Sequence, residues 1–128
     1  MSISETEGDA APFDRWIVAE FARRGGFTCF VILVEIKDTA VTPLCSTYLN
    51  VIGDETRWSD IDVMFAGAGV KWDGAAFFPS LDSEGLLDNP TARVRLRLLE
   101  QRVDDDRLVL NEGAFFDKLG RRMRIDEA

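Results

Sequence analysis

The apolar side chains of residues 12–24 recur with the period of an amphipathic helix. A proline suits the first turn of a helix, and the two glycines at positions 25 and 26 are typical of its end. The pattern therefore predicts a helix over residues 12–24, preceded by a disordered acidic arm over residues 1–11. The apolar stripe consists of Phe13, Trp16, Ile17 and Phe21.

The next two segments have the patterns of strands. Phe27–Lys37 is almost continuously apolar and rich in β-branched and aromatic residues, which predicts a central strand buried on both faces. After an expected loop that contains Thr42 and Pro43, residues 45–52 alternate between two faces, as in a half-buried strand. The two strands are expected to pair antiparallel. Their cysteines, Cys29 and Cys45, are expected to be reduced and buried.

Two interpretations compete for the segment after residue 56. Ser59 and Asp62 have the spacing of a capping box, and Trp58 has the spacing to pack on Val63. A helix that ends at Gly69 would bury one stripe, whereas a strand would place alternate residues on one face. The cap favours the helix. The stripe expected for the helix is Ile61, Met64, Phe65 and Ala68, and the face expected for the strand is Ile61, Val63 and Phe65.

A turn over residues 72–74 and a short buried strand, Ala75–Phe78, are expected next. Asn89 and Pro90 then indicate a helix start, although residues 93–98 also alternate as a strand would. The cap again favours the helix, with Ala92, Leu96, Leu99 and Val103 as its buried stripe.

Short strands are predicted for the last part of the chain, at Leu108–Leu110 and Ala114–Asp117. A turn at residues 118–120 should then lead into a hairpin arm over Arg121–Ile125, with Met123 and Ile125 inside. The predicted order is α-β-β-α-β-α-β-β-β. This order indicates an α+β fold in a single domain, residues 12–128, whose mainly antiparallel sheet carries its helices on one side.

The amino-acid composition limits the kinds of catalytic and metal-binding sites that the chain can form. The 128 residues include no histidine, which removes the commonest general base and metal ligand, and the two cysteines form no Cys-x-x-Cys motif. The net charge is −8, and residues 1–88 hold 15 acidic and 6 basic groups, so a nucleic-acid partner is not expected. Neither a signal peptide nor a long apolar run is present, which leads us to expect a cytoplasmic protein that does not enter a membrane.

Asp60 and Asp62 are the candidate metal ligands. The string Ser59-Asp60-Ile61-Asp62-Val63 is similar to the Asp-x-Asp step of nucleotidyltransferases. That resemblance implies two carboxylates that hold a nucleotide's magnesium, together with a Gly-Ser turn upstream and a third carboxylate. The upstream pair here is Gly53-Asp54, which lacks the hydroxyl, and Asp73 is the proposed third carboxylate. The two glycines at positions 67 and 69 are read as a helix stop, not as a phosphate loop.

The leading functional hypothesis is a non-catalytic cytosolic module without a cofactor, which binds another protein or associates with itself. Its motivation is that no nucleophile-base, metal or phosphate motif is complete. The alternatives are a metal-dependent nucleotide enzyme that uses Asp60 and Asp62, and an acidic inhibitor or immunity-type protein. The candidate partner contacts are Trp72, Arg93, Arg97, Arg122 and Arg124.

Overall fold

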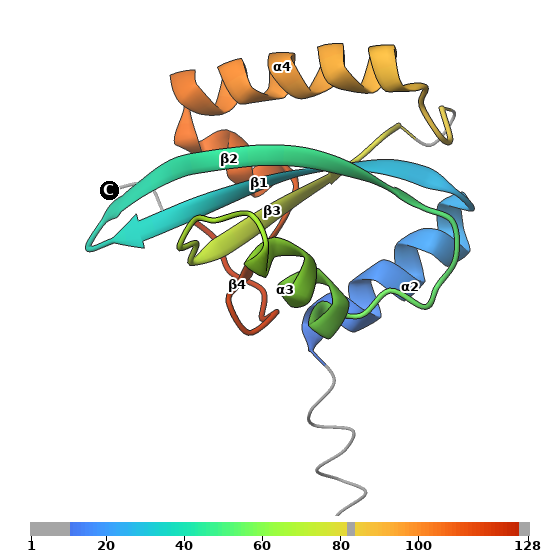
Figure 1. The fold of residues 1–128 in the computed structure, drawn as a ribbon, viewed down its shortest axis with the longest axis horizontal. Helices are drawn as coiled ribbons and strands as arrows, with labels where there is room; N and C mark the ends of the chain where they lie inside the picture. The colour runs from blue at the N-terminus through green and yellow to red at the C-terminus, as the bar shows by residue number, and fades with distance from the viewer. Residues whose placement is uncertain (1–10, 82–83, 126–128) are drawn as a thin grey trace, which may run out of the picture.

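The computed structural model describes residues 11–81 and 84–125. A four-stranded antiparallel sheet with the order β2-β1-β3-β4 lies at its centre, and helices pack on it, which confirms the predicted α+β class (Figure 1). The predicted arm lies outside the described residues, apart from Ala11, which packs against the core. The elements are α2 (Pro12–Arg24), β1 (Phe27–Lys37), β2 (Ala40–Val51), α3 (Trp58–Ala66), β3 (Gly74–Pro79), α4 (Asn89–Asp105), the 3₁₀ helix η1 (Arg107–Glu112) and β4 (Ala114–Asp117).

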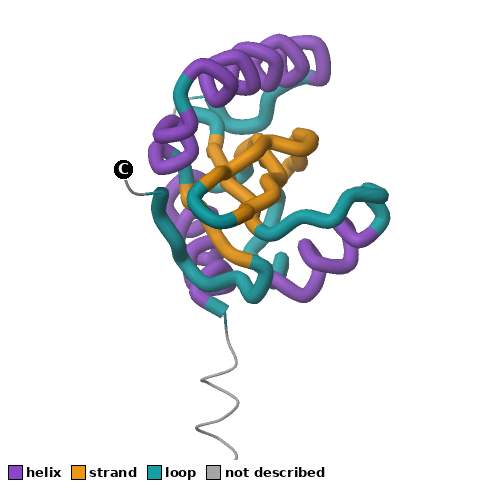
Figure 2. The backbone as a smooth tube through the Cα atoms, turned by 90° about the vertical axis from the view of Figure 1, so that its left-hand side faces the viewer, coloured by secondary structure: helices purple, strands orange, loops and turns teal. Residues whose placement is uncertain are grey.

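Strand β1 is buried on both faces, as predicted, and it separates two hydrophobic clusters. The sheet is covered by α4 on one side and by α2 and α3 on the other (Figure 2). The expectation that all helices cover one side is therefore wrong. Since successive side chains of a strand point to opposite faces, a strand that is apolar on both faces needs a covering layer on each. Cys29, Val31 and Leu33 of β1 join the α2–α3 cluster, and Phe30, Ile32 and Val34 join the α4 cluster.

An aromatic group fills the α2–α3 side of the sheet. The ring of Phe13 in α2 lies 5.2 Å from Trp58 in α3, 4.9 Å from Phe77 in β3 and 5.2 Å from Phe116 in β4, measured between ring centroids. Offset and edge-on ring pairs of this kind add about 0.5–1.5 kcal/mol each beyond their buried area. One side chain from α2 thus joins α3 to two strands of the sheet.

Polar bonds hold Trp58 in this group. Its backbone N–H donates to Oδ1 of Asp14 at 2.7 Å, and its indole N–H donates to the carbonyl of Lys118 at 3.0 Å. Gly120 faces the same ring: its φ is +77°, and a Cβ there would approach the indole at 2.7 Å. The turn after β4 therefore requires glycine at this position.

Both contested helices are present, but their N-caps lie earlier than predicted, by two positions in α3 and by one in α4. In α3 the N-cap is Arg57, whose backbone N–H donates to the Asp60 carboxylate at 3.0 Å, so the predicted Ser59–Asp62 box is wrong. The predicted contact of Trp58 with Val63 is also wrong, because Val63 is 75% exposed. The earlier start adds Trp58 to the face that already carries Ile61 and Phe65.

The C-terminal end of α3 and the N-cap of α4 also lie earlier in the chain than predicted. Helix α3 ends at Ala66, before Gly67 and not at Gly69. In α4 the N-cap is Asp88 and not Asn89, and hydrogen bonds from Thr91 hold the pKa of the Asp88 carboxyl below its usual range. The buried residues of the two helices are Trp58, Ile61 and Phe65 in α3, and Ala92, Leu99 and Val103 in α4.

Strand β2 begins at Ala40, five residues before the predicted start. The expected loop is replaced by a tight turn after β1 in which Asp38 has a φ of 53°. Pro43 therefore lies inside the strand, next to a register shift opposite Leu33 and Val34. Proline is tolerated in a strand at a sheet edge, where its missing N–H breaks no ladder bond.

The C-terminal segments differ in part from the prediction. Leu108–Leu110, expected as a strand, belongs to η1, where the Asp106 carboxylate accepts a bond from the Leu108 N–H at 3.0 Å. Ala114–Asp117 is β4, as predicted. The expected hairpin is reduced to one bridge between Phe116 and Arg122. Met123 and Ile125 pack on the α4 cluster, as expected.

A buried polar network ties the loop after β3 to the start of β1. Thr28 is fully buried, and its Oγ1 accepts a bond from the Leu87 N–H at 2.8 Å and donates to Oδ1 of Asn50 at 2.8 Å. Ser80 donates to the carbonyl of Gly85 at 2.8 Å, and its own N–H bonds the Thr28 carbonyl at 2.7 Å. All of these groups are satisfied, and they hold the loop together with Leu87, which packs on the α4 cluster.

We expect Thr28→Val to lower the free energy of unfolding by about 1–3 kcal/mol, because the Leu87 N–H would lose its partner inside the protein. Urea unfolding monitored by tryptophan fluorescence measures this loss. The matched control is Thr47→Val on exposed β2, which should change stability by less than about 0.5 kcal/mol. Equal effects of the two substitutions would contradict the role of the network.

Candidate functional site

The predicted metal ligands have separate surroundings. Asp60 accepts a bond from the Arg57 N–H at the start of α3, and Asp62 is exposed on the same helix. Asp73, the proposed third carboxylate, instead accepts a bond from the N–H of Ile36 at 2.7 Å at the far end of β1. Within residues 11–81 and 84–125, no three acidic or thiol side chains lie close enough together to hold a metal ion.

The residues predicted to contact a partner do not share one surface. Trp72 is only 2% exposed, because its ring lies between Phe65, at 5.7 Å, and Trp58, at 6.0 Å. It is therefore a core residue and offers no surface for a partner. Arg122 and Arg124 are exposed on the C-terminal segment, and the Arg122 guanidinium lies 5.5 Å from the centre of the Phe116 ring.

The remaining two candidates, Arg93 and Arg97, lie beside an open sheet edge on β2. The backbone of Thr28 in β1 faces β3, since its carbonyl bonds the Ser80 N–H and its N–H bonds the Ser80 hydroxyl. Its partner across the β1–β2 ladder is Asn50, so that pair exchanges no backbone bonds and the Asn50 backbone faces outward. By alternation, the backbone groups of Tyr48 and Ser46 face outward as well. In the described part of the chain nothing bonds these three N–H or C=O groups.

The first half of the same edge is partly blocked. The outward carbonyl of Val41 accepts a bond from Nε of Arg107 at 2.9 Å, and Pro43 has no N–H to offer. The register shift next to Pro43 further interrupts the strand. At the opposite side of the sheet, the N–H of Met123 bonds the Phe115 carbonyl of β4 at 2.9 Å and covers that edge. In the described part of β2, Ser46–Asn50 is thus the uninterrupted run of outward N–H and C=O groups.

Helix α4 runs beside this open edge. Oη of Tyr48 donates to Oδ1 of Asn89 at 3.1 Å, and Oγ of Ser46 donates to the Glu100 carboxylate. Asn89 and Glu100 lie on one row of the helix, and Arg93 and Arg97 fall on that row between them. Both arginines are exposed, and their positions in the helix lie between Asn89, which contacts Tyr48, and Glu100, which contacts Ser46.

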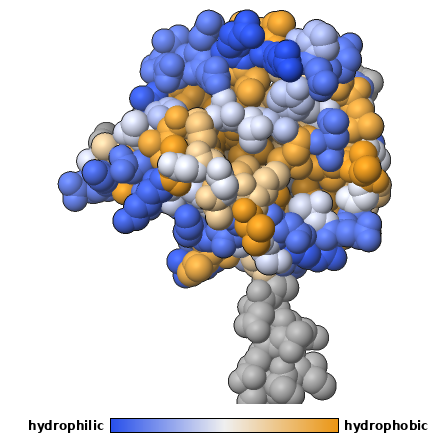
Figure 3. Space-filling model, in the orientation of Figure 1, coloured by the Kyte–Doolittle hydropathy of each residue, from blue (hydrophilic) through white to orange (hydrophobic). Residues whose placement is uncertain are grey.

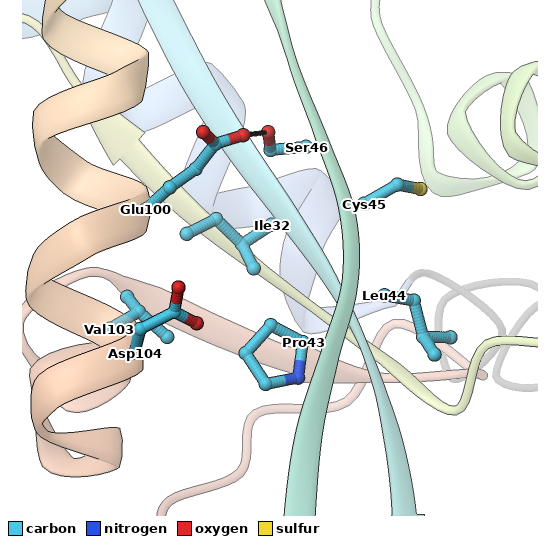
Figure 4. A pocket seen from close by; sticks show the side chains of 8 residues that line it. All are labelled: Ile32, Pro43, Leu44, Cys45, Ser46, Glu100, Val103 and Asp104. Atoms are coloured by element: carbon cyan, nitrogen blue, oxygen red, sulfur yellow. Dashed lines mark hydrogen bonds between the residues drawn. The ribbon is translucent and has the colours of Figure 1, made fainter.

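A hollow of about 210 Å³ lies at the other end of the row, between α4 and β2 (Figure 4). The Glu100 and Asp104 carboxylates enter it from the helix, and Ser46 reaches it from the strand. Cys45 points away from these carboxylates, to the other side of β2. The row along α4 is therefore basic at Arg93 and Arg97 and acidic from Glu100 onward, where it lies over Pro43–Ser46.

Neither cysteine has the surroundings of an activated nucleophile. Burial raises the pKa of the Cys29 thiol far above its usual range, and partial desolvation raises that of Cys45. A reactive cysteine needs a lowered pKa, so that the thiolate is present near neutral pH. Cys45 is exposed, which corrects the expectation that both thiols are buried.

The surface around the edge is mixed in polarity. Hydrophilic residues line the top of the molecule, where α4 lies, while paler and apolar residues occupy the middle of the same face (Figure 3). Ser46, Tyr48 and Asn50 are not among the site residues predicted from the sequence. Pro43 was the available signal, because a proline within an alternating strand indicates an edge.

The open edge makes a direct prediction for amide hydrogen exchange. The amides of Thr47 and Leu49 face β1 and should exchange slowly, whereas those of Ser46, Tyr48 and Asn50 face solvent and should exchange fast. Exchange followed residue by residue with NMR checks this alternation. Uniform protection along residues 46–50 would show that the edge is covered.

The separate surroundings of Asp60 and Asp62 predict different effects of their removal. Asp60→Ala should lower the free energy of unfolding by about 1 kcal/mol relative to Asp62→Ala, because only Asp60 bonds the N-cap of α3. Thermal melts of both variants, with and without millimolar Mg²⁺, measure this difference. A magnesium-dependent stabilisation that both substitutions abolish would instead support a metal site.

No helix in the described part of the chain is long and apolar enough to cross a membrane. Comparisons of the chain with protein-family models, with curated protein sequences and with solved structures find no match.

Proposed function

We propose that this protein is a non-catalytic protein-binding module that takes up an extended segment of a partner as an added strand. The observation that supports this proposal is the row of outward N–H and C=O groups on Ser46, Tyr48 and Asn50, on an edge whose first half is partly blocked. A strand added to a sheet edge gains affinity from backbone hydrogen bonds and specificity from alternate side chains. We place the protein in the cytoplasm, where its free thiols would remain reduced.

The length of the open segment, Ser46–Asn50, fits a short partner segment that binds reversibly. Three outward-facing residues offer three donors and three acceptors. At about 0.5–1.5 kcal/mol net per hydrogen bond, six bonds contribute several kcal/mol before the cost of ordering the partner. Side-chain contacts with α4 therefore have to supply part of the affinity, which makes the arginines beside the edge relevant to partner choice.

The edge can be blocked without touching the ladder inside the protein. Ser46→Pro removes an outward N–H while leaving the bonds to β1, and Pro43 already occupies an outward position on the same strand. Peptides selected from a random phage library on the wild-type protein should bind Ser46→Pro about tenfold more weakly, as measured by calorimetry. Ser46→Ala is the matched control, because it also loses the bond to Glu100 but keeps the N–H.

Ser46→Pro is first compared with wild type in urea unfolding, so that a folding defect is recognised. In the wild type, a bound peptide should also slow amide exchange at Ser46, Tyr48 and Asn50, a readout that needs no variant. Peptides that bind Ser46→Pro as well as wild type, and that leave these amides unprotected, would show that the edge is not the binding surface.

A further inference from the structure

Two arginines beside the open edge lack the partners that other arginines of α4 have. Arg95 bonds the Glu84 carboxylate, and Arg102 lies 2.8 Å from that of Glu112. Arg93 and Arg97 form no ion pair with any residue of 11–81 or 84–125. Their charges are therefore available on a chain whose net charge is −8.

The spacing of these two charges matches a strand. Residues four apart on an α-helix are separated by about 6 Å along the axis. Side chains two apart on one face of a strand are separated by about 7 Å. A segment added beside Ser46–Asn50 would therefore present alternate side chains to Arg93 and Arg97 in step.

We propose that the partner segment is acidic, with carboxylates at alternate positions that face Arg93 and Arg97 from the added strand. This inference rests on the proposed function, and it names the chemistry of the partner. Two arginines on an otherwise acidic protein give the edge a local preference for anions that the rest of its surface opposes. The carboxylates of Glu100 and Asp104 follow on the same row, so a partner carboxylate is disfavoured from Ser46 toward Pro43.

The same charges argue against a second copy of this chain as the occupant. Both arginines belong to the part of α4 between Asn89, which contacts Tyr48, and Glu100, which contacts Ser46. Two copies paired antiparallel through this segment would bring the arginines of both helices to one place. Like charges held close together oppose association, so the acidic segment of another protein fits the edge better.

The test uses two blocked synthetic peptides, one of alternating glutamate and valine and one of alternating glutamine and valine. Fluorescence anisotropy at low salt should show about fivefold tighter binding of the glutamate peptide, as expected for two exposed ion pairs. In the double variant Arg93→Gln/Arg97→Gln this preference should disappear. The control Arg15→Gln/Arg124→Gln changes the net charge equally at two exposed sites outside the α4 row and should keep the preference.

The outcomes separate this inference from the proposed function. Equal binding of both peptides, still lost in Ser46→Pro, would overturn the acidic preference and leave strand addition intact. Failure of these peptides and of the library-selected peptides to bind would overturn both. A wild-type dimer in sedimentation that dissociates in Ser46→Pro would place a second copy on the edge and overturn the acidic partner segment.

Discussion

The rest of the structure depends on the burial of β1 on both faces. A strand with apolar side chains on both sides cannot border solvent, so it requires a strand at each edge and a helical layer above and below. The aromatic group around Phe13 supplies one layer, and the apolar stripe of α4 supplies the other. Once β1 is central, β2 becomes an outer strand, and its free side has to be capped, covered or used.

The protein treats its two sheet edges differently. The segment around Met123 covers β4, and Arg107, Pro43 and a register shift partly block the first half of β2. In the described part of β2, Ser46–Asn50 is the uninterrupted run of outward backbone groups, and two arginines of α4 lie between the helix residues that contact it. An exposed sheet edge can pair with other chains. The edge of β2 is partly blocked in its first half and has two arginines of α4 near its second half, which supports the proposed binding surface.

Most residues that looked chemically distinctive in the sequence have structural roles. Asp60 bonds the start of α3, Asp73 bonds the end of β1, and Trp72 packs between two aromatic rings. These roles explain why acids, glycines and tryptophans gather between residues 56 and 80. Caps and turns need carboxylates and glycine for reasons that resemble those of an active site.

The sequence by itself determined the α+β class, the central strand β1 and the existence of α2, α3 and α4, because hydrophobic periodicity is a local property of the chain. It missed the caps at Arg57 and Asp88, whose hydrogen bonds span three residues each, because neighbouring residues offered the same local pattern. It missed the strand residues around Pro43 because their extension depends on pairing with β1. Only the tertiary structure decided which backbone groups of β2 face solvent and which arginines lie beside them. These properties depend on strand order and on the position of α4 over the sheet, and neither is encoded in the spacing of neighbouring residues.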